Sequence, residues 1–281
     1  MSQKLNKEEA KKRIKKLRQE IERHNYLYYV LDKPEISDAE WDAMFHELRD
    51  LEEQYPEFIT NNSPTVRIGG KVLDKFNKVV HKDKMMSLND AKNKTEVQEW
   101  YNRIIKLLPT DTSIDFYCEY KFDGLSISTI YKKGEFVLGA TRGDGYIGED
   151  VTENLKTIKT IPLKLFKDVD AEVRGEVILT KKEFERVNKE QEKLGLPLYA
   201  NPRNLAAGSV RQLNSKITAS RHLDFVAYKL VTDLGQKTHK DEHEIIEKLG
   251  FKTTNKENCY AKNLDEVFQY YDKVEQNRDK L

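Results

Sequence analysis

The sequence predicts an α+β fold in which a helical hairpin precedes a mostly antiparallel mixed unit. Apolar residues near the start recur every three or four positions, which is the spacing of one helix face. Strand-like runs then cluster within residues 114–141, and the later strands and helices do not alternate strictly, which disfavours a doubly wound parallel sheet. The 281 residues, 10% of them aromatic, suffice for one large or two ordinary domains with a real core.

The helical hairpin is expected to form a first domain over residues 1–68. Pro34 breaks the first helix, and Ser37, with Glu40 three positions later, predicts the capped start of the second helix. Two amphipathic helices with a short link favour an antiparallel pair. The apolar face of the first helix is Ala10, Ile14, Leu17, Ile21, His24 and Tyr28, and that of the second is Trp41, Met44, Phe45, Leu48 and Leu51.

The mixed unit is expected to form a second domain over residues 69–281, joined to the first by turn formers in residues 60–70. A three-residue loop, 132–134, predicts a hairpin between two of its strands. Thr180 and Glu183 predict a helix cap. The predicted strands are 114–120, 125–131, 135–141, 171–179 and 225–231, and the predicted helices are 95–108, 180–195, 242–249 and 264–278, the last two of them on the surface.

Composition excludes several classes of protein. No run of 18 apolar residues exists, so a membrane span is not expected, and the first residues carry no apolar signal segment. The 49 basic and 48 acidic residues give a net charge of +1, without the bulk basicity of many DNA-binding proteins. Cys118 and Cys259 are too few for a disulfide scaffold or a four-cysteine zinc site. A reducing cytoplasm is therefore the expected location.

Residues 143–148 match the dinucleotide-binding pattern GxGxxG, and Asp168 lies 20 residues after the last glycine. We reject a Rossmann fold for two reasons. The preceding strand belongs to a predicted hairpin, and three acids in residues 149–153 would face the place where a pyrophosphate sits. A glycine pattern alone is a weak indication of nucleotide binding.

Residues 118–124, Cys-Glu-Tyr-Lys-Phe-Asp-Gly, end one predicted strand and turn into the next. Strand alternation would put Glu119 and Lys121 on the same face. A lysine at a strand end, facing a cleft, can act as a covalent nucleophile once its amine is neutral. The alternative is a lysine in an ordinary surface ion pair beside an Asp-Gly turn. The spacing alone leaves both interpretations open.

This Lys-x-Asp-Gly element resembles motif I of the covalent nucleotidyltransferases, which are DNA ligases, RNA ligases and capping enzymes. Its surroundings are similar to the bacterial NAD+-dependent DNA ligases over essentially the whole chain. The resemblance implies an adenylation domain of the ATP-grasp-like nucleotidyltransferase type. The matching strings are 118–124, 141–145 with 148–150, 172–176, 200–204 and 208–213.

The resemblance implies a role for each matching residue. Lys121 would be the adenylated nucleophile, Asp123 would support the lysine and the ribose region, and Glu119 would contact adenine. Arg142 and Glu176 stand where the family binds the ribose and phosphate of AMP. The remaining nucleotide contacts would be Ser87 and Leu88, which are followed here by Asn89-Asp90 where Asp-Asn is usual, and Tyr228, which would stack on adenine.

The first domain resembles domain Ia of these ligases, which binds the nicotinamide mononucleotide (NMN) half of NAD+. Tyr28, Asp38 and Asp42 match its motif. Trp41 stands where tyrosine is usual and still offers a flat face to a nicotinamide ring. Two aspartates beside a cationic pyridinium are electrostatically favourable. Arg203, Arg211 and Arg278 match arginines that the family uses on DNA phosphates or on the NMN half.

The implied substrates are NAD+ and nicked double-stranded DNA, in replication and repair. Lys121 would take AMP from NAD+, pass it to the 5′-phosphate of the nick, and the 3′-hydroxyl would displace AMP. Mg2+, with Mn2+ as a possible substitute, is expected to balance the phosphate charge. We also expect a monomer in the bacterial cytosol. The family's cysteine zinc module has no counterpart here, because the chain has only two cysteines.

The chain stops at Leu281, before the place of the family's motif V lysine, and we interpret it as a C-terminally incomplete adenylation domain. Alone it is expected to bind NAD+ weakly, to self-adenylate poorly and not to seal nicks. Two other interpretations stay open. One is an RNA ligase or capping-type nucleotidyltransferase, against which the first domain argues. The other is a degenerate, non-catalytic nucleotide-binding module.

Overall fold

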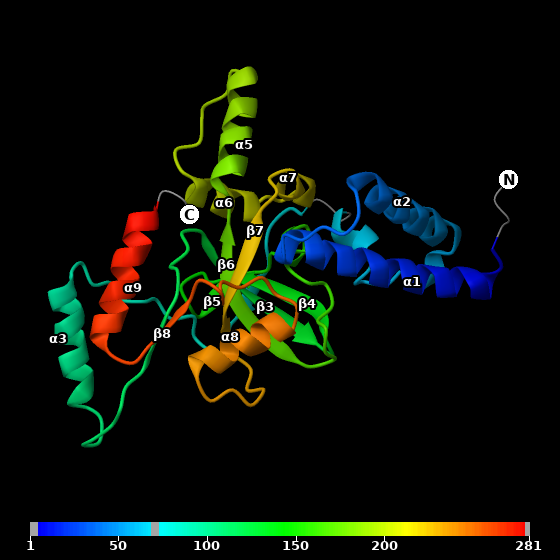
Figure 1. The fold of residues 1–281 in the computed structure, drawn as a ribbon. Coiled ribbons are helices and arrows are strands. Elements are labelled where there is room, and N and C mark those ends of the chain that lie inside the picture. Colours follow the sequence, from blue (N-terminus) through cyan, green and yellow to red (C-terminus); the bar gives the residue numbers. More distant parts are fainter. Residues whose placement is uncertain (1–4, 69–72, 279–281) are drawn as a thin grey trace.

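The computed structural model describes residues 5–68 and 73–278. Its N-terminal unit is a pair of helices, α1 (Lys7–Asn25) and α2 (Asp38–Gln54), drawn in blue in Figure 1. The predicted capping box of α2 is confirmed. The Ser37 side chain accepts from the backbone N–H of Glu40, and the Glu40 side chain accepts from the backbone N–H of Ser37. Two short 3₁₀ turns follow, η2 (Pro56–Phe58) and η3 (Pro64–Ile68). The glycines of the predicted linker at 69 and 70 lie outside the described residues.

The prediction that Tyr28 continues the buried face of the first helix is wrong. Ala10, Ile14, Leu17 and Ile21 are buried, but α1 passes at Tyr26 into a π-helical turn, η1 (Tyr26–Val30). A π-helical turn contains more residues than an α-helical turn, so it rotates the following side chains off the original face. Tyr28 is accordingly 46% exposed, and its ring packs beside that of Tyr29.

The second unit is built on a four-stranded antiparallel sheet of order β4-β3-β6-β7. The predicted hairpin joins β3 to β4 with Lys133 and Gly134, both at positive φ, in its turn. Two smaller antiparallel pairs, β1–β5 and β2–β8, complete the strands that are described. Their bounds are β1 Lys78–Val80, β2 Phe116–Cys118, β3 Leu125–Lys132, β4 Glu135–Thr141, β5 Ile147–Glu149, β6 Ala171–Ile178, β7 Asp224–Leu230 and β8 Cys259–Ala261.

Helices pack against the sheet and extend from it. In Figure 1, α5 projects away from the sheet while α6 and α8 lie close to it. Contacts join α6 to β6, α4 to β4 and α8 to β7. Within the described residues no helix has both the length and the apolar character that crossing a membrane requires. The bounds are α3 Lys94–Ile105, α4 Thr152–Leu155, α5 Lys181–Lys193, α6 Pro202–Val210, α7 Ser215–Ala219, α8 His239–Lys248 and α9 Leu264–Asn277.

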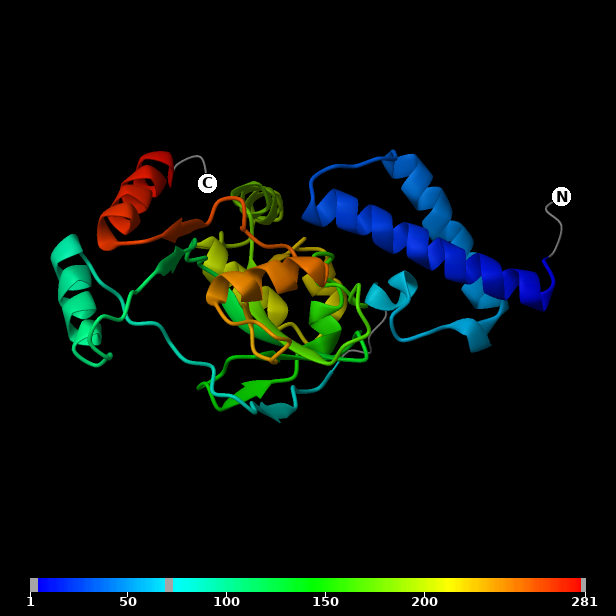
Figure 2. The same cartoon turned by 60° about the horizontal axis from the view of Figure 1, so that its bottom comes forward.

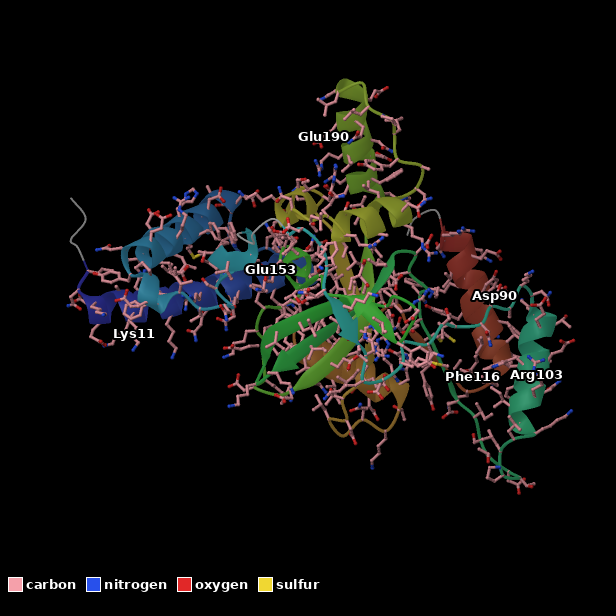
Figure 3. The ribbon with its side chains drawn as sticks, turned by 180° about the vertical axis from the view of Figure 1, so that it is seen from behind. Lys11, Asp90, Arg103, Phe116, Glu153 and Glu190 are labelled. Atoms are coloured by element: carbon pink, nitrogen blue, oxygen red, sulfur yellow. The ribbon has the colours of Figure 1, made fainter. Side chains whose placement is uncertain are left out.

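The structure has two separate apolar cores. The larger one lies around the four-stranded sheet and includes the fully buried rings of Tyr131, Phe225 and Phe251. The smaller one holds the helical pair together through Ile14 and Leu48 and their neighbours. Figure 3, seen from behind, labels Glu153 where the helical unit meets the sheet unit. Two cores of this kind agree with the predicted fold class, a helical hairpin followed by an antiparallel α+β unit.

The pair β2–β8 and the helices α3 and α9 form an outlying group at one side of the sheet. Figure 2 shows this group on the opposite side of the molecule from the α1–α2 pair. Lys94 on α3 bonds Asp272 on α9 at 2.9 Å, and the ring of Phe116 on β2 lies against Trp100 and Tyr101. Figure 3 labels Phe116 and Arg103 within this group.

The structure corrects several predicted bounds. The strand predicted over 114–120 is only three residues long, because it pairs with the equally short β8. The helix predicted over 242–249 begins at His239, where Thr238 caps it, and it is not merely a surface helix because His243 and Ile246 are buried. Sequence patterns missed the short elements β1, β5, β8, α4, α6 and α7, whose three to nine residues are too few to show a clear period.

Candidate functional site

A large cavity of about 1360 Å³ opens beside the four-stranded sheet. Strands β3, β6 and β7 supply one part of its lining. The other parts come from the loop that carries Lys121, the turn after β4, the segment 83–88, and residues of α6 and α8. Most of the predicted site residues meet here, including two of the three arginines predicted to contact DNA or NMN, although they come from distant parts of the chain. These residues are Ser87, Leu88, Glu119, Lys121, Arg142, Glu176, Arg203, Arg211 and Tyr228.

Lys121 lies on a loop and not on a strand. The strand β2 ends at Cys118, so the predicted strand alternation that would align Glu119 with Lys121 does not apply. Lys121 is exposed in the cavity wall, and its Nζ donates only a long bond of 3.4 Å to the backbone carbonyl of Phe122. Among residues 5–68 and 73–278, no carboxylate lies at hydrogen-bond distance from this amine, which is accessible to a ligand.

The glycine that closes the Lys-x-Asp-Gly element is required by close packing. A Cβ atom on Gly124 would lie 2.1 Å from the carbonyl oxygen of Val177 on β6. No side chain fits there without moving one of the two segments, because such contacts are far below van der Waals distance. Gly124 thus sets how closely the Lys121 loop approaches the central sheet.

Two of the predicted residues are engaged in exposed ion pairs. Asp123 accepts from Arg203 Nη1 at 3.0 Å, so its carboxylate points to an arginine rather than to Lys121. Arg211 makes a two-pronged contact with Glu149, with N···O distances of 2.6 and 2.9 Å. In both pairs the arginine side chain is more than half exposed, so the pair is weak and the arginine can be recruited by a phosphate.

Glu176 projects from β6 into the cavity and accepts from the backbone of Gly124. Burial raises the pKa of Glu176 above its ordinary value, and the positive charges of Lys121 and Arg203 oppose that change only in part. The carboxylate of Glu176 is thus suited to accept hydrogen bonds from ribose hydroxyls or to balance the charge of a cation.

The carboxylate of Glu119 faces two histidines of α8. Its Oε2 lies 2.7 Å from His243 Nε2 and 3.5 Å from His239 Nε2. Burial opposes ionisation of Glu119, but the close approach of His239 and His243 outweighs it and lowers the pKa of Glu119 to about 2. The group is therefore an anion throughout the physiological range.

The other predicted nucleotide residues take part in two hydrogen bonds between side chains of the cavity wall. The Tyr228 hydroxyl lies 2.7 Å from Ser126 Oγ, and burial raises the pKa of Tyr228. Arg142 Nη1 donates to Ser87 Oγ at 3.3 Å. Leu88, in contrast, is 77% exposed at the cavity.

A second cavity of about 300 Å³ lies in the N-terminal unit, and it contains all four residues that were predicted there. Trp41 is held in place by its Nε1, which donates to Asn25 Oδ1 at 3.0 Å, and by its ring, which stacks on Phe45. Lys159, from the sheet unit, completes the cavity wall. The predicted residues in this lining are Tyr28, Asp38, Trp41 and Asp42.

Sequence reasoning missed three residues at these cavities. Lys159 donates to the Tyr29 hydroxyl at 2.6 Å and lies over the Trp41 ring at 5.4 Å. Arg174 is buried under the large cavity, and His239 lines it. A lone lysine between two ordinary segments has no sequence signal, whereas the HxxxH spacing of His239 and His243 on a helix could have been noticed.

Arg278 is not brought to either cavity within the described residues. It is exposed at the C-terminal end of α9. The glycine pattern 143–148 is a tight turn between β4 and β5, in which the Asp144 side chain accepts from the backbone of Tyr146 and Ile147. No helix begins inside this pattern, which agrees with the rejection of a Rossmann fold.

Comparisons with known proteins agree with this arrangement. Residues 73–281 match the family model of the NAD-dependent DNA ligase adenylation domain, and residues 7–69 match that of the DNA ligase-like N-terminal NAD+-binding domain. The DNA ligase of Thermotoga petrophila is 45% identical over 283 aligned residues, which cover 100% of this chain and 41% of that protein. That of Caldicellulosiruptor bescii is 46% identical, covering 96% of this chain and 40% of its own length. The chain thus spans about two fifths of these curated relatives.

Proposed function

The chain belongs to the family of the NAD-dependent DNA ligase adenylation domain, and from that premise we propose that it is the nucleotidyl-transfer part of a DNA ligase. The observation that carries the proposal is the meeting of Lys121 with Glu119, Arg142, Glu176 and Tyr228 around one cavity. A lysine amine that pairs with no carboxylate in the described part of the chain, beside arginines suited to phosphate, fits nucleophilic attack on phosphorus.

In the proposed first step, Lys121 Nζ attacks the α-phosphate of NAD+, forms a P–N bond and releases NMN. The amine must lose its protons before it can share its lone pair. Arg142 and Arg203 line the same cavity and would offset the negative charge that develops on the phosphate oxygens. Glu119 would accept from adenine, Tyr228 would stack on it, and Glu176 would accept from the ribose. Ser87 and Leu88 would border the base, and Asp123 would hold Arg203 in place.

We propose that the second cavity receives the NMN half of NAD+. Trp41 would lie against the nicotinamide ring, Tyr28 beside it, and the carboxylates of Asp38 and Asp42 would face its positive charge. Lys159 adds a cation that could meet the NMN phosphate.

In the longer protein, AMP would pass from Lys121 to the 5′-phosphate of a nick, and the 3′-hydroxyl would then displace it. Arg203, Arg211 and Arg278 are proposed to contact DNA phosphates or NMN, because their side chains are exposed and cationic. We also propose a division at residue 68 between an NMN-binding and an adenylation domain, a monomer, and a place in the bacterial cytosol.

Mg2+ or Mn2+ is part of the proposal only as a counter-ion for phosphates. Mg2+ binds through one or two carboxylates together with substrate phosphates. Glu176 is the carboxylate proposed to face such an ion, because it lines the cavity beside Lys121 and the arginines that would meet the phosphates. The ion would supply charge neutralisation when bound.

The deciding experiment is mass spectrometry of the intact protein after incubation with NAD+ or with ATP. The chain is tested alone and fused to the remaining part of a curated relative. We expect an AMP adduct from NAD+ that maps to Lys121 and is absent from Lys121→Ala. Lys132→Ala is the matched control, because Lys132 only pairs with Asp170 on the surface.

Each other result has a definite meaning. Labelling of Lys121 by ATP instead of NAD+ would favour the RNA ligase or capping type. No adduct in either protein would favour a non-catalytic nucleotide-binding module. Equal labelling of Lys121→Ala would refute the assignment of the nucleophile.

The NMN site has its own test, since Trp41 and Trp100 are the two tryptophans of the chain. In Trp100→Phe all indole fluorescence comes from Trp41, and we expect NMN to quench it because a stacked pyridinium accepts an electron from indole. In Trp41→Phe the signal comes from Trp100 on the outlying α3, and no saturable quenching is expected. Saturable quenching in both variants would contradict the site.

A further inference from the structure

Three side chains that are far apart in sequence converge at the edge of the large cavity. Glu119 follows β2, while His239 and His243 lie one turn apart on α8, so both rings project from the same helix face. The two Nε2 atoms point at a single oxygen, Glu119 Oε2, at 2.7 Å for His243 and 3.5 Å for His239. All three donor atoms lie within 4.8 Å of one another.

The other nitrogen of each ring is already taken by an acceptor. His239 Nδ1 lies 3.1 Å from Glu242 Oε2, a carboxylate that can only accept. His243 Nδ1 lies 3.0 Å from Asn255 Oδ1. The orientation of the Asn255 amide is fixed, because its Nδ2 donates to Glu247 Oε2 at 2.7 Å and to the carbonyl of His243. Both Nδ1 atoms therefore carry their proton.

With both Nδ1 atoms protonated, each Nε2 meets the Glu119 carboxylate through a lone pair unless its ring takes up a second proton. Three electron-rich atoms at such distances repel one another unless a positive charge lies among them. His243 is only 1% exposed, so water cannot screen the repulsion there. His243 Nε2 and Glu119 Oε2 are also buried without a hydrogen bond of proper geometry. Two added protons would create two imidazolium rings with centroids only 4.8 Å apart.

We propose that Glu119, His239 and His243 form a site for a divalent transition-metal ion, with Zn2+ as the best fit. Two imidazoles and one carboxylate are a common ligand set for zinc, usually with an open fourth position. Ligands about 2.1 Å from a tetrahedral ion are about 3.4 Å apart, and the two measured separations lie on either side of that value.

The acceptors behind the rings resemble the outer shell of known metal sites. A histidine that binds a metal through one nitrogen usually donates the other N–H to a carboxylate or a carbonyl, which fixes the ring and increases its basicity. Glu242 and Asn255 fill those places here. Since Glu119 and His239 line the large cavity, the open position would face it, and Glu119 Oε1 would stay available to a nucleotide.

The site differs from a cysteine zinc module, because it uses no cysteine and lies in the wall of the nucleotide cavity. Its existence does not depend on the proposed ligase function. An ion bound there would pin the carboxylate of Glu119 and join the Lys121 loop to α8.

The test is isothermal titration of the chelator-treated chain with Zn2+, and with Co2+ while its visible absorption is recorded. We expect one ion per chain, a Co2+ spectrum typical of low coordination number, and a higher unfolding temperature with Zn2+. Glu119→Gln and His239→Gln should each weaken binding about tenfold or more and remove the thermal shift.

His239→Gln is the histidine variant used in the test, because replacement of the buried His243 can damage the fold. The matched control is His222→Gln. His222 is exposed and also pairs with a glutamate, Glu183, but no third possible metal ligand joins them in the described part of the chain. That variant should bind Zn2+ like the parent. Absence of stoichiometric binding by the parent, or unchanged binding by Glu119→Gln and His239→Gln, would overturn the proposal. Both outcomes are independent of whether Lys121 is adenylated.

Discussion

Arg174 organises the floor of the large cavity. It is buried on β6, donates twice to Glu172 Oε1, and also donates to the carbonyls of Asp83 and Lys84 at 2.7 and 3.2 Å. One guanidinium thus ties the central sheet to the segment that leads to Ser87. Its planar fork with several donors is what makes these contacts possible together.

Replacing Arg174 by methionine should destabilise the protein by about 3–5 kcal/mol, because Glu172 would remain as a buried, unpaired carboxylate. Chemical denaturation measures this loss. Arg186→Met is the control, since Arg186 forms surface pairs with Glu183 and Glu190 and should cost about 1 kcal/mol or less. Equal costs for the two variants would contradict the assigned role.

At the residue scale, the sequence predicted which residue types would gather but not how they pair. Lys121, Glu176 and Tyr228 line one cavity, as the family resemblance implied. The partner of Asp123 is Arg203, and that of Glu119 is a pair of histidines on α8. Such pairings join segments about 80 to 120 residues apart, and they depend on tertiary packing that single-residue patterns do not contain.

At the scale of the elements, long periodic segments were predictable and short ones were not. The strand Glu135–Thr141 was predicted with its observed bounds, because its turn and alternation are strong signals. The strands β1 and β5 were missed, since three residues show no period and they exist only by pairing with each other. The π-helical turn η1 was missed because Tyr28 falls at the helical spacing of the preceding apolar face, and nothing in that spacing marks a change from an α-helical to a π-helical turn.

Gly124 controls how the Lys121 loop meets β6, so Gly124→Ala should be costly. The added methyl would clash with the Val177 carbonyl, and we expect a loss of about 3 kcal/mol together with reduced adenylation. Gly208→Ala is the control, because Gly208 lies in α6 with nothing within 4 Å of the new Cβ. That change should be neutral or stabilising by up to about 1 kcal/mol. Thermal unfolding of the two variants side by side checks the contrast.

At the scale of the whole molecule, one partly buried arginine connects the two units. Arg67 in η3 donates to the carbonyls of Lys156, Ile158 and Ile161 at 3.0 to 3.1 Å. Burial lowers the pKa of Arg67 to about 10, which still leaves the side chain charged at neutral pH. The sequence placed Arg67 in a linker, where nothing indicated that it would be partly buried.

Removing this connection should uncouple the units. Arg67→Met would leave three buried carbonyls without donors, at a cost of about 3 kcal/mol. We expect calorimetry to resolve two unfolding transitions in the variant where the parent shows one. Arg49→Met serves as the control, because Arg49 contacts only acids of its own helix. A single unshifted transition in Arg67→Met would show that the units are joined by other contacts.

The pairing of β2 with β8 has a consequence for how the protein is made. Cys118, three residues before Lys121, aligns with Cys259, which the ribosome adds 141 residues later. The strand that leads into the lysine loop therefore cannot pair until residues 259–261 have left the ribosome. Pairing over such a separation is slow to form during folding. The nascent chain can thus assemble its N-terminal helices and its central sheet while the segment that leads to Lys121 still lacks its strand partner, which makes that segment depend on the synthesis of residues far downstream.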